Sequence, residues 1–333
     1  MACICWNVQG LGAKGIGRAL KNLLFKYKPN FVFLSETKQK KVKLEKLKRK
    51  LRIDNSFYVD PEGIAGGLAL WWDNDTKISI IRANKNVIDC SISCCKGNEW
   101  FCSFVYGPSY REKKEKFWEG MKSLRRDREA PWCVMGDSNI VIRKEEKLGG
   151  NIYDLGQANW ILNFIGECDL LEMNLKCGPF SWSNQRTDNE SILEGIDRVL
   201  FNSAWFDLFN RAEGFLETAI GSNYNPIICN LFGYYRKRMR DFKFESKWLL
   251  EDDCNQVITN SWKHPSIRIT EENICSKLSR TSNKLKKWCR EKFGKHKRKL
   301  DELQKQISDI QKGQLMSEYA DLVNKLKEEL DKE

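Results

Sequence analysis

Short apolar runs separated by polar segments dominate the first 232 residues of the chain. The runs are rich in Val, Ile, Cys, Phe and Trp, and many alternate between apolar and polar positions, as half-buried strands do. We expect strands at Cys3–Val8, Phe31–Ser35, Gly67–Trp72, Ile78–Ile81, Val87–Cys94, Trp100–Tyr106, Trp132–Gly136, Phe180–Asn184, Ile196–Phe201 and Ile227–Leu231.

Four longer segments have helical character: Gly15–Tyr27, Lys40–Leu51, Arg111–Arg125 and Leu155–Cys168. The predicted strands outnumber these helices and do not alternate regularly with them. This pattern indicates an α/β fold in which two packed sheets carry helices on their outer faces, rather than a single parallel sheet.

The pattern changes near Tyr234, after which no strand-like run occurs. Two apolar stripes with helical spacing follow, separated by Gly313, and the first has the three-four-three spacing of a coiled coil. The stripes are Leu300, Leu303, Ile307, Ile310 and then Leu315, Tyr319, Leu322, Leu326, Leu330. We therefore expect a domain over 1–232, a connector over 233–272, and a C-terminal arm over 273–333. The arm is either a helical hairpin or a coiled coil that self-associates, and two solvated helices without a specific partner remain an alternative.

The charge of the chain is +12, and much of it lies in two clusters. Lys38–Arg52 and Lys284–Lys299 each hold nine basic residues and one acidic residue. Lysine binds phosphate as a point charge, so these clusters favour DNA, or RNA, without reading its sequence. The candidate contacts are Lys38, Lys40, Lys41, Lys287, Arg290, Lys297 and Arg298. Charge that serves solubility alone is the other interpretation.

Nothing in the sequence points to a membrane or to secretion. The chain has no run of roughly 18 apolar residues, and its first residues are too short and too polar for a signal peptide. We expect an intracellular protein of the nucleus or cytoplasm, with no membrane partner. The 13 cysteines form no CxxC pair, and many fall in strand-like runs, so they read as reduced core residues. With only His264 and His296 available, the spacing argues against a zinc site.

Many of the apolar runs end or open with a residue that can act on a phosphate. These residues are Asn7, Glu36, Tyr106, Asp137, Asn139 and Asp197. Because the ends of adjacent strands lie close together, the six can converge on one rim. Hydrolysis of a phosphodiester needs a hard divalent cation, an oriented phosphate and water, and a base. Glu36 with Asn7 suits the metal, and the group of Asp137, Asn139 and Tyr106 suits the phosphate.

Eight segments together resemble the exonuclease–endonuclease–phosphatase superfamily, and within it the endonuclease of plant LINE-type retrotransposons. They are Cys5–Gly12, Phe33–Lys38, Gly66–Trp72, Val105–Pro108, Gly136–Asn139, Glu146–Gly150, Gly178–Asn184 and Ile196–Leu200. Asp241–Trp248 and the lysine-rich helices resemble the connector that precedes a reverse transcriptase in such elements, and no reverse transcriptase follows within this sequence.

The resemblance implies a DNase I-like four-layer sandwich of two mixed sheets flanked by helices. It also implies a DNA nick that depends on Mg²⁺, or on Mn²⁺ in its place. It assigns Asn7 and Glu36 to the metal, and it assigns phosphate and nucleophile to Tyr106, Asp137 and Asn139. Asp197 lies in a family motif, and Ser181 occupies a position where Ser or Thr is usual.

The departures from the family lie in its closing Ser-Asp-His-x-Pro motif, which here reads Ser222-Asn223-Tyr224-Asn225-Pro226. The family's His works in acid–base or charge-stabilising chemistry, and its Asp orients and charges that His. Tyrosine has an unperturbed pKa of ~10 and is a poor base at neutral pH. Losing a positioned acid–base group costs ~10²–10⁴-fold in rate. Ser138 also replaces the usual Phe between Asp137 and Asn139, and we expect it to pack less tightly there.

The sequence thus predicts a Mg²⁺-dependent nucleic-acid phosphodiesterase domain of retrotransposon origin with impaired activity. Its catalytic candidates are Tyr106, Asp137, Asn139, Asp197, Ser222, Asn223 and Tyr224. Two alternatives stay open: a non-catalytic nucleic-acid-binding protein that uses the basic helices, and a phosphatase or exonuclease that acts on another phosphoester and uses Tyr224 differently.

Overall fold

In the computed structural model of the chain, the structure describes residues 1–13, 15–94, 98–126, 130–186, 190–218, 222–233, 244, 246–262, 277–278, 280–289 and 291–292. These residues belong to two compact units, one ending near residue 234 and one formed by the described residues from 244 onward.

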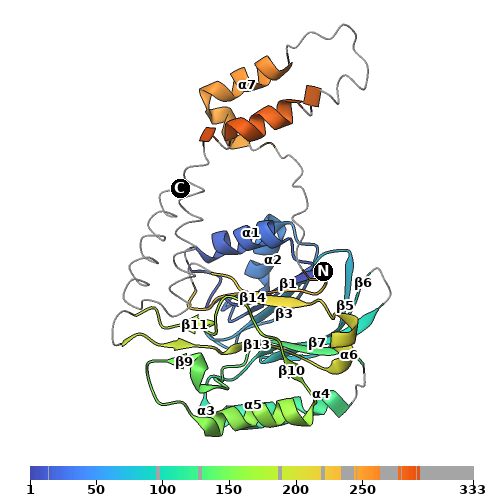
Figure 1. Cartoon of the computed structure of the whole chain (residues 1–333), viewed down its shortest axis with the longest axis vertical. Helices are drawn as coiled ribbons and strands as arrows, with labels where there is room; N and C mark the ends of the chain where they lie inside the picture. Colours follow the sequence, from blue (N-terminus) through green and yellow to red (C-terminus); the bar gives the residue numbers. More distant parts are fainter. Residues whose placement is uncertain are drawn as a thin grey trace. The chain divides into compact units, whose positions relative to one another are not determined.

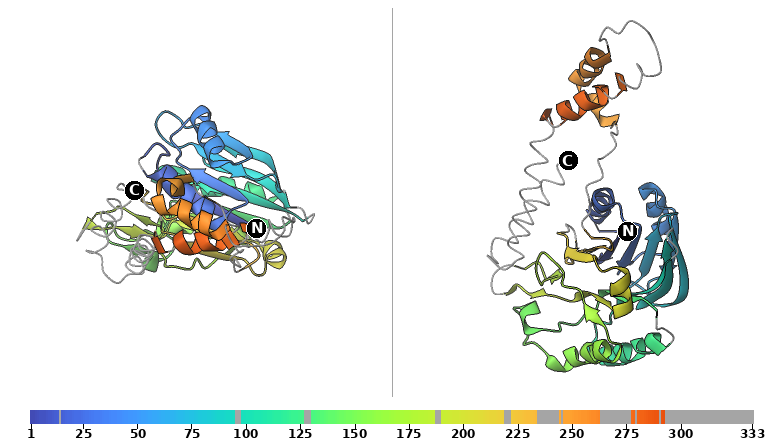
Figure 2. Two further views of the ribbon diagram at one scale, coloured as in Figure 1. Left: turned by 90° about the horizontal axis from the view of Figure 1, so that it is seen from above. Right: turned by 45° about the vertical axis from the view of Figure 1, so that its right-hand side comes forward.

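The first unit contains two six-stranded sheets (Figures 1 and 2). The first sheet has the order β14-β15-β1-β2-β4-β3, and within it β1 and β2 run parallel. The second has the order β10-β13-β8-β7-β6-β5, with β7 parallel to β8. The strands of these sheets are β1 (Ala2–Asn7), β2 (Phe31–Ser35), β3 (Asn55–Val59), β4 (Leu68–Trp72), β5 (Thr76–Asn84), β6 (Val87–Cys94), β7 (Glu99–Tyr106), β8 (Trp132–Asp137), β10 (Leu171–Glu172), β13 (Asp197–Phe201), β14 (Glu213–Leu216) and β15 (Ile227–Asn230).

Helices cover the outer face of each sheet, and a small third sheet lies beside them. Its strands are β11 (Trp182–Ser183), β12 (Leu193–Glu194) and β9 (Lys147–Leu148). The helices of the unit are α1 (Ile16–Tyr27), α2 (Lys41–Leu51), α3 (Arg111–Met121), α4 (Ser123–Arg126), α5 (Leu155–Glu167), α6 (Ser203–Leu208) and the 3₁₀ turn η1 (Lys144–Glu146). In Figure 1 the helices α1 and α2 lie on the opposite side of the sheets from α3 and α5.

Three apolar clusters hold these four layers together. Side chains such as Phe33 of β2 and Phe104 of β7 stack between the sheets with ring centroids 5.1 Å apart. Leu20 of α1 packs on the outer face of the first sheet, and Phe164 of α5 packs on the second. The predicted DNase I-like α/β sandwich of two mixed sheets flanked by helices is therefore confirmed.

Several boundaries differ from the prediction for physical reasons. The edge strand β3 was not predicted, because every residue in it is only half buried and shows no apolar contrast. The predicted strand Phe180–Asn184 reduces to the two residues of β11, and the predicted helix Arg111–Arg125 breaks into α3 and α4. Short elements such as β14 and α6 carry too few residues for a periodic signal.

The second unit is helical where it is described. The 3₁₀ turn η3 (Ser246–Leu250) leads into α7 (Asp252–Trp262), and residues 280–289 are also helical. Trp248, Cys254, Leu285 and Trp288 form its apolar core. The predicted stripes of the 273–333 arm, together with His264 and His296, lie outside the described residues. Among the residues that are described, no helix has the length and apolar character needed to cross a bilayer.

Candidate active site

Strand register brings polar residues of both sheets to one end of the sandwich. In the second sheet Tyr106 pairs with Asp137, and Asp137 pairs with Asp197 on the other side. In the first sheet Asn7 pairs with Ser35, so that Glu36 follows directly beyond the strand end. The register of the strands therefore aligns their ends, and this alignment places the polar side chains next to one another.

Asp137 is the centre of the group, and it links the two sheets. Asn7 Nδ2 from the first sheet donates to Asp137 Oδ2 at 2.9 Å. The backbone N–H of Asn139 donates to Asp137 Oδ1 at 2.8 Å, and Asn139 Nδ2 lies 3.2 Å from Oδ2 and 2.7 Å from the carbonyl oxygen of Gly107. The turn that carries Asn139 requires this residue at φ +52°, a left-handed conformation that Asn tolerates better than most residues.

Gly136 allows the two strands before this turn to approach closely. Its φ is +136°, and a Cβ placed on it would lie 2.2 Å from the carbonyl oxygen of Val105. Ser138, which follows Asp137, is buried, and its hydroxyl donates to the carbonyl oxygen of Ile196 at 2.5 Å. A hydrogen bond to the neighbouring strand thus fixes the Ser138 side chain, and the expectation that serine in place of phenylalanine loosens the packing around Asp137 and Asn139 stays a prediction.

Glu36 lies at the more exposed side of the same end. Its Oε1 accepts a hydrogen bond from the Tyr106 hydroxyl at 2.8 Å, and Lys38 Nζ lies 3.7 Å from Oε2. Within the described part of the chain, no three His, Cys, Asp or Glu side chains are grouped to hold a metal. Mg²⁺ needs less, because it is commonly bound by one or two carboxylates plus waters. The oxygens of Glu36 and Asn7 fit that preference.

Burial and mutual repulsion shift the acidity of the carboxyl groups. Burial is the main cause that raises the pKa of Asp137 to about 7, while hydrogen bonds from Asn7 and Asn139 act in the opposite direction. Burial, followed by the charge of Asp137, also raises the pKa of Asp197 well above its usual range. Asp137 can therefore exchange a proton near neutral pH, which suits a general base.

Tyr224, a residue of the Ser222–Pro226 segment, is almost completely buried. Its backbone N–H donates to Ser222 Oγ at 3.1 Å, and the Ser222 hydroxyl donates to the carbonyl oxygen of Asn7 at 2.9 Å. Burial is the main cause that raises the pKa of Tyr224 far above its usual value, and the charges of Asp137 and Asp197 add to the effect. The phenol therefore stays protonated and cannot accept a proton.

Tyr224 lies close to carboxylates from outside the Ser222–Pro226 segment. Residues 222 and 223 form a bend, and Tyr224 makes a β-bridge to Trp182. The backbone of Asn223 contacts Gln9 and Ser183, through hydrogen bonds of 3.2 and 3.0 Å. The carboxylates that act on Tyr224 belong to Asp137, Asp197 and Glu36.

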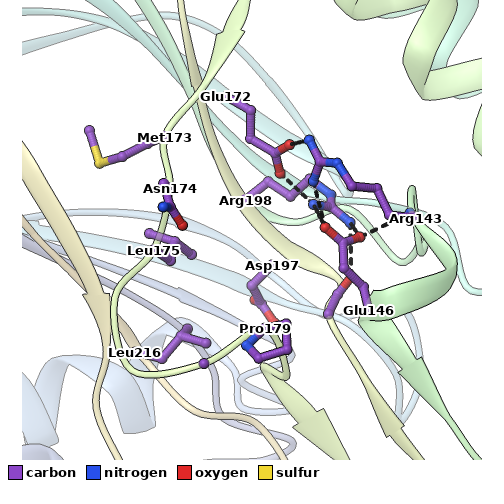
Figure 3. A pocket seen from close by; sticks show the side chains of 12 residues that line it. Arg143, Glu146, Glu172, Met173, Asn174, Leu175, Pro179, Asp197, Arg198 and Leu216 are labelled. Carbon is purple, nitrogen blue, oxygen red and sulfur yellow. Dashed lines mark hydrogen bonds and ion pairs between the residues drawn. The ribbon is translucent and has the colours of Figure 1, made fainter. Parts of the chain in front are cut away.

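Ser181 and the Arg198–Glu146 ion pair fix the strand that carries Asp197, although the sequence assigns them no catalytic role. Ser181 Oγ accepts hydrogen bonds from the backbone N–H groups of Ile196 and Asp197, both at 3.0 Å. The next residue, Arg198, is buried and donates to Glu146 Oε2 at 2.5 Å. Figure 3 shows this ion pair beside a cavity of about 250 Å³ that Asp197 also lines. Within the Glu146–Gly150 motif, Glu146 thus stabilises the strand that carries Asp197 through its ion pair with Arg198.

The predicted nucleic-acid contacts are only partly visible. Lys38 lies beside Glu36, and Lys40 and Lys41 are exposed at the start of α2. Lys287 is exposed in the second unit and lies 3.8 Å from Glu291 Oε1. The side chains of Arg290, Lys297 and Arg298 lie outside the described residues. Where the lysines are described, they are solvent-accessible, as phosphate contacts need to be.

Comparison with known proteins yields similarity in structure and none in sequence. No protein-family model matches the chain. No curated protein matches it either. Among solved structures, the chain is similar to a 3′-5′ exonuclease, NExo, from Neisseria meningitidis, with a TM-score of 0.54 and 14% identity over 70% of this chain and 100% of that one.

Two further solved structures extend the likeness. The AP endonuclease LMAP from Leishmania major has a TM-score of 0.55 and 14% identity, covering 68% of this chain and 86% of that one. The endonuclease domain of TRAS1, a telomere-specific non-LTR retrotransposon, has a TM-score of 0.53 and 13% identity, covering 71% and 99%. Likenesses at such low identity establish the fold of residues 1–232, which is that of the DNase I-like endonucleases, exonucleases and phosphatases.

Proposed function

We propose that residues 1–232 form a metal-dependent nucleic-acid phosphodiesterase domain of the retrotransposon endonuclease type, whose cleavage of DNA is slow because Tyr224 replaces a histidine. The observation that carries this proposal is the hydrogen-bonded group of Asn7, Asp137 and Asn139, with Glu36 and Tyr106 beside it. Two sheets must meet to build this group, and its residue types are those that phosphodiester hydrolysis requires.

Each side chain has a role in this proposal that follows from its contacts. Asp137, with a pKa of about 7, takes the proton of the attacking water. Asn139, whose amide donates to the carbonyl oxygen of Gly107 and to Asp137, fixes the orientation of the Asp137 carboxylate toward the phosphate and the water. Glu36 and Asn7 would hold Mg²⁺, or Mn²⁺, which neutralises charge on the phosphate when it is bound. The Tyr106 hydroxyl fixes the carboxylate of Glu36.

Tyr224 explains the low activity in this scheme. A histidine at this position would carry a positive charge between Asp137 and Asp197, because neighbouring carboxylates favour the charged form of an imidazole. The buried phenol supplies neither that charge nor a base. The same raised pKa argues against a role of Tyr224 as a nucleophile, since a phenol attacks as its anion. The expected deficit is the ~10²–10⁴-fold that a positioned acid–base group contributes.

Nucleic-acid binding without cleavage is the second candidate function. The exposed lysines at the start of α2 favour it, because Lys38 continues this basic surface to the site itself. One structural neighbour, a 3′ phosphatase from Neisseria, has been solved with a product DNA hairpin. DNA is therefore the partner we propose for this surface, with RNA as the alternative. A phosphatase or exonuclease reaction would use the same group of residues to act at the end of a nucleic-acid strand.

A plasmid assay separates these functions. Supercoiled DNA incubated with the full chain in Mg²⁺ should be nicked slowly, and both EDTA and the substitution Glu36→Gln should abolish nicking. Retention of DNA in a gel-shift experiment without any nicking over days would favour the binding function. Release of phosphate or nucleotides from DNA ends, with closed circles left intact, would favour the phosphatase or exonuclease.

A further inference from the structure

One lysine of helix α3 differs from its neighbours in being buried. The helix contains Lys113, Lys114 and Lys116, of which the first and last are exposed, whereas Lys114 is only 9% exposed. The reason is helical spacing, because Lys114 shares the inward face with Trp118 and Met121, four and seven residues further on. A buried ammonium group needs hydrogen-bond partners to offset the loss of water.

The partners of Lys114 connect the helix to the candidate active site. Its Nζ donates to the backbone carbonyl oxygen of Asn139 at 2.7 Å and to Gln157 Oε1 at 2.9 Å. Gln157 is itself held by Asp154, the N-cap residue of α5. The ammonium therefore ties together α3, α5 and the turn after β8. Glu194, Asp137 and Asp154 attract its charge, and Arg111 opposes it, while burial lowers the pKa of Lys114.

The carbonyl group that accepts from Lys114 belongs to Asn139, whose backbone is in the left-handed region. Asn139 has φ +52°, and its N–H and side-chain amide point to Asp137 and to Gly107. The carbonyl of Asn139 belongs to the peptide unit that joins Asn139 to Ile140. A hydrogen bond to this carbonyl oxygen therefore fixes the orientation of that peptide unit relative to Asn139. Without Lys114, that carbonyl would lose a charge-assisted hydrogen bond and the turn could relax to a more common conformation.

We propose that Lys114 is a positioning residue of the phosphodiester site, which holds the turn of Asn139 so that the N–H groups of Asn139 keep the carboxylate of Asp137 in place. This inference rests on the proposed function. Lys114 donates to the backbone carbonyl oxygen of Asn139 and to Gln157, and not to the side chains that would act on the phosphate. Its loss should therefore impair the chemical step and leave nucleic-acid binding intact.

Hydrogen exchange tests the structural half of this inference without any need for activity. Lys114→Met keeps most of the length of the side chain and removes its donors, Lys114→Arg keeps charge and donors, and Lys116→Met makes the same change at an exposed site of the same helix. In Lys114→Met the amides of residues 137–142 should exchange roughly 10-fold faster or more, with β1 and β2 unchanged. Lys114→Arg and Lys116→Met should match the original chain. Should Lys114→Met fail to fold, Lys114→Gln takes its place.

Kinetics test the functional half in a chain that carries Tyr224→His. There Lys114→Met should lower kcat for plasmid nicking by roughly 10-fold or more, with KM unchanged, and Lys114→Arg should restore most of it. Unchanged exchange at 137–142, or an equal increase over the whole domain, would overturn the inference. So would a change confined to KM. If Tyr224→His itself gives no nicking, the proposed function fails, and the exchange result still decides whether Lys114 holds the turn.

Discussion

The substitution Asp137→Asn should change the way in which stability depends on pH. Burial raises the pKa of Asp137 to about 7 in the folded chain, against ~3.9 for an unfolded Asp. The folded state therefore binds this proton more tightly than the unfolded state. The stabilisation is complete below about pH 4 and is lost as the pH rises through 7. At about 1.4 kcal/mol for each pKa unit, the total is at most roughly 4 kcal/mol in the metal-free protein.

Urea unfolding of the full chain in EDTA, followed by tryptophan fluorescence between pH 4.5 and 8, measures this dependence. Other groups contribute in both directions: Asp197 has a raised pKa, and contacts with Arg198 help to lower that of Glu146. The contribution of Glu146 is common to both proteins and largely cancels in the difference. The charge of Asp137 helps to raise the pKa of Asp197, so the difference reports on these two carboxyl groups together. The advantage of the original chain over Asp137→Asn should fall by roughly 3–4 kcal/mol across this range.

The comparison of the original chain with Asp137→Asn depends on how their difference in stability changes with pH, and not on its absolute value. The amide introduced at position 137 will place one donor against the N–H groups of Asn7 or Asn139, which costs the same free energy at every pH. Only the slope therefore carries information about the carboxyl group. A difference that stays constant within about 1 kcal/mol would show that Asp137 does not titrate in this range. Its assignment as the general base would then lose its basis.

Three further outcomes are expected. Tyr224→His alone should raise the nicking rate by roughly 10²-fold, because Asp137 and Asp197 already face the position; a strict additional need for Asn223→Asp would show that the neighbour at 223 matters after all. Deleting residues 273–333 should flatten the plot of log affinity for DNA against log salt by ~0.9 for each phosphate that the arm neutralises, and an unchanged slope would remove the arm from the interface. Glu146→Gln should destabilise the chain by roughly 1–3 kcal/mol in chemical denaturation, because the buried guanidinium of Arg198 loses one of its two carboxylate partners and keeps Glu172; a loss below about 0.5 kcal/mol would contradict this.

The strands that stand out most clearly in the sequence are those whose faces are both covered. β1, β2, β8 and β13 are buried at every position, so each reads as a continuous apolar run that stands out from its surroundings. β3 is half buried throughout, and β9 to β12 have only two residues each, so no window of sequence can distinguish them from loops. Their presence depends on a neighbouring strand rather than on a local pattern.

Some residues of the candidate site could likewise be predicted from the sequence, and others could not. Asn7, Glu36 and Asp137 follow covered strands, and strand ends meet in space, so their convergence could be predicted. Lys114 could not, because one buried lysine among several in a charged helix differs from the others only through tertiary contacts. The carboxylates near position 224 could not be predicted for a related reason. Sequence adjacency suggests residue 223, whose role stays a prediction, and only the fold adds Asp137 from β8 and Asp197 from β13.

Under the proposed function, the packing of Tyr224 makes the loss of a histidine at this position easier than its return. Its ring belongs to an apolar cluster that includes Trp6, Ile196 and Ile228, and it makes an edge-on contact with Trp182 at 6.5 Å. A chain that regains histidine exchanges this packing for a smaller, charged ring, at a cost in folding free energy of the order of 1–3 kcal/mol. Copies of such a chain would therefore drift toward the stable, slow form, and a revertant would need a second, stabilising change elsewhere before it could persist.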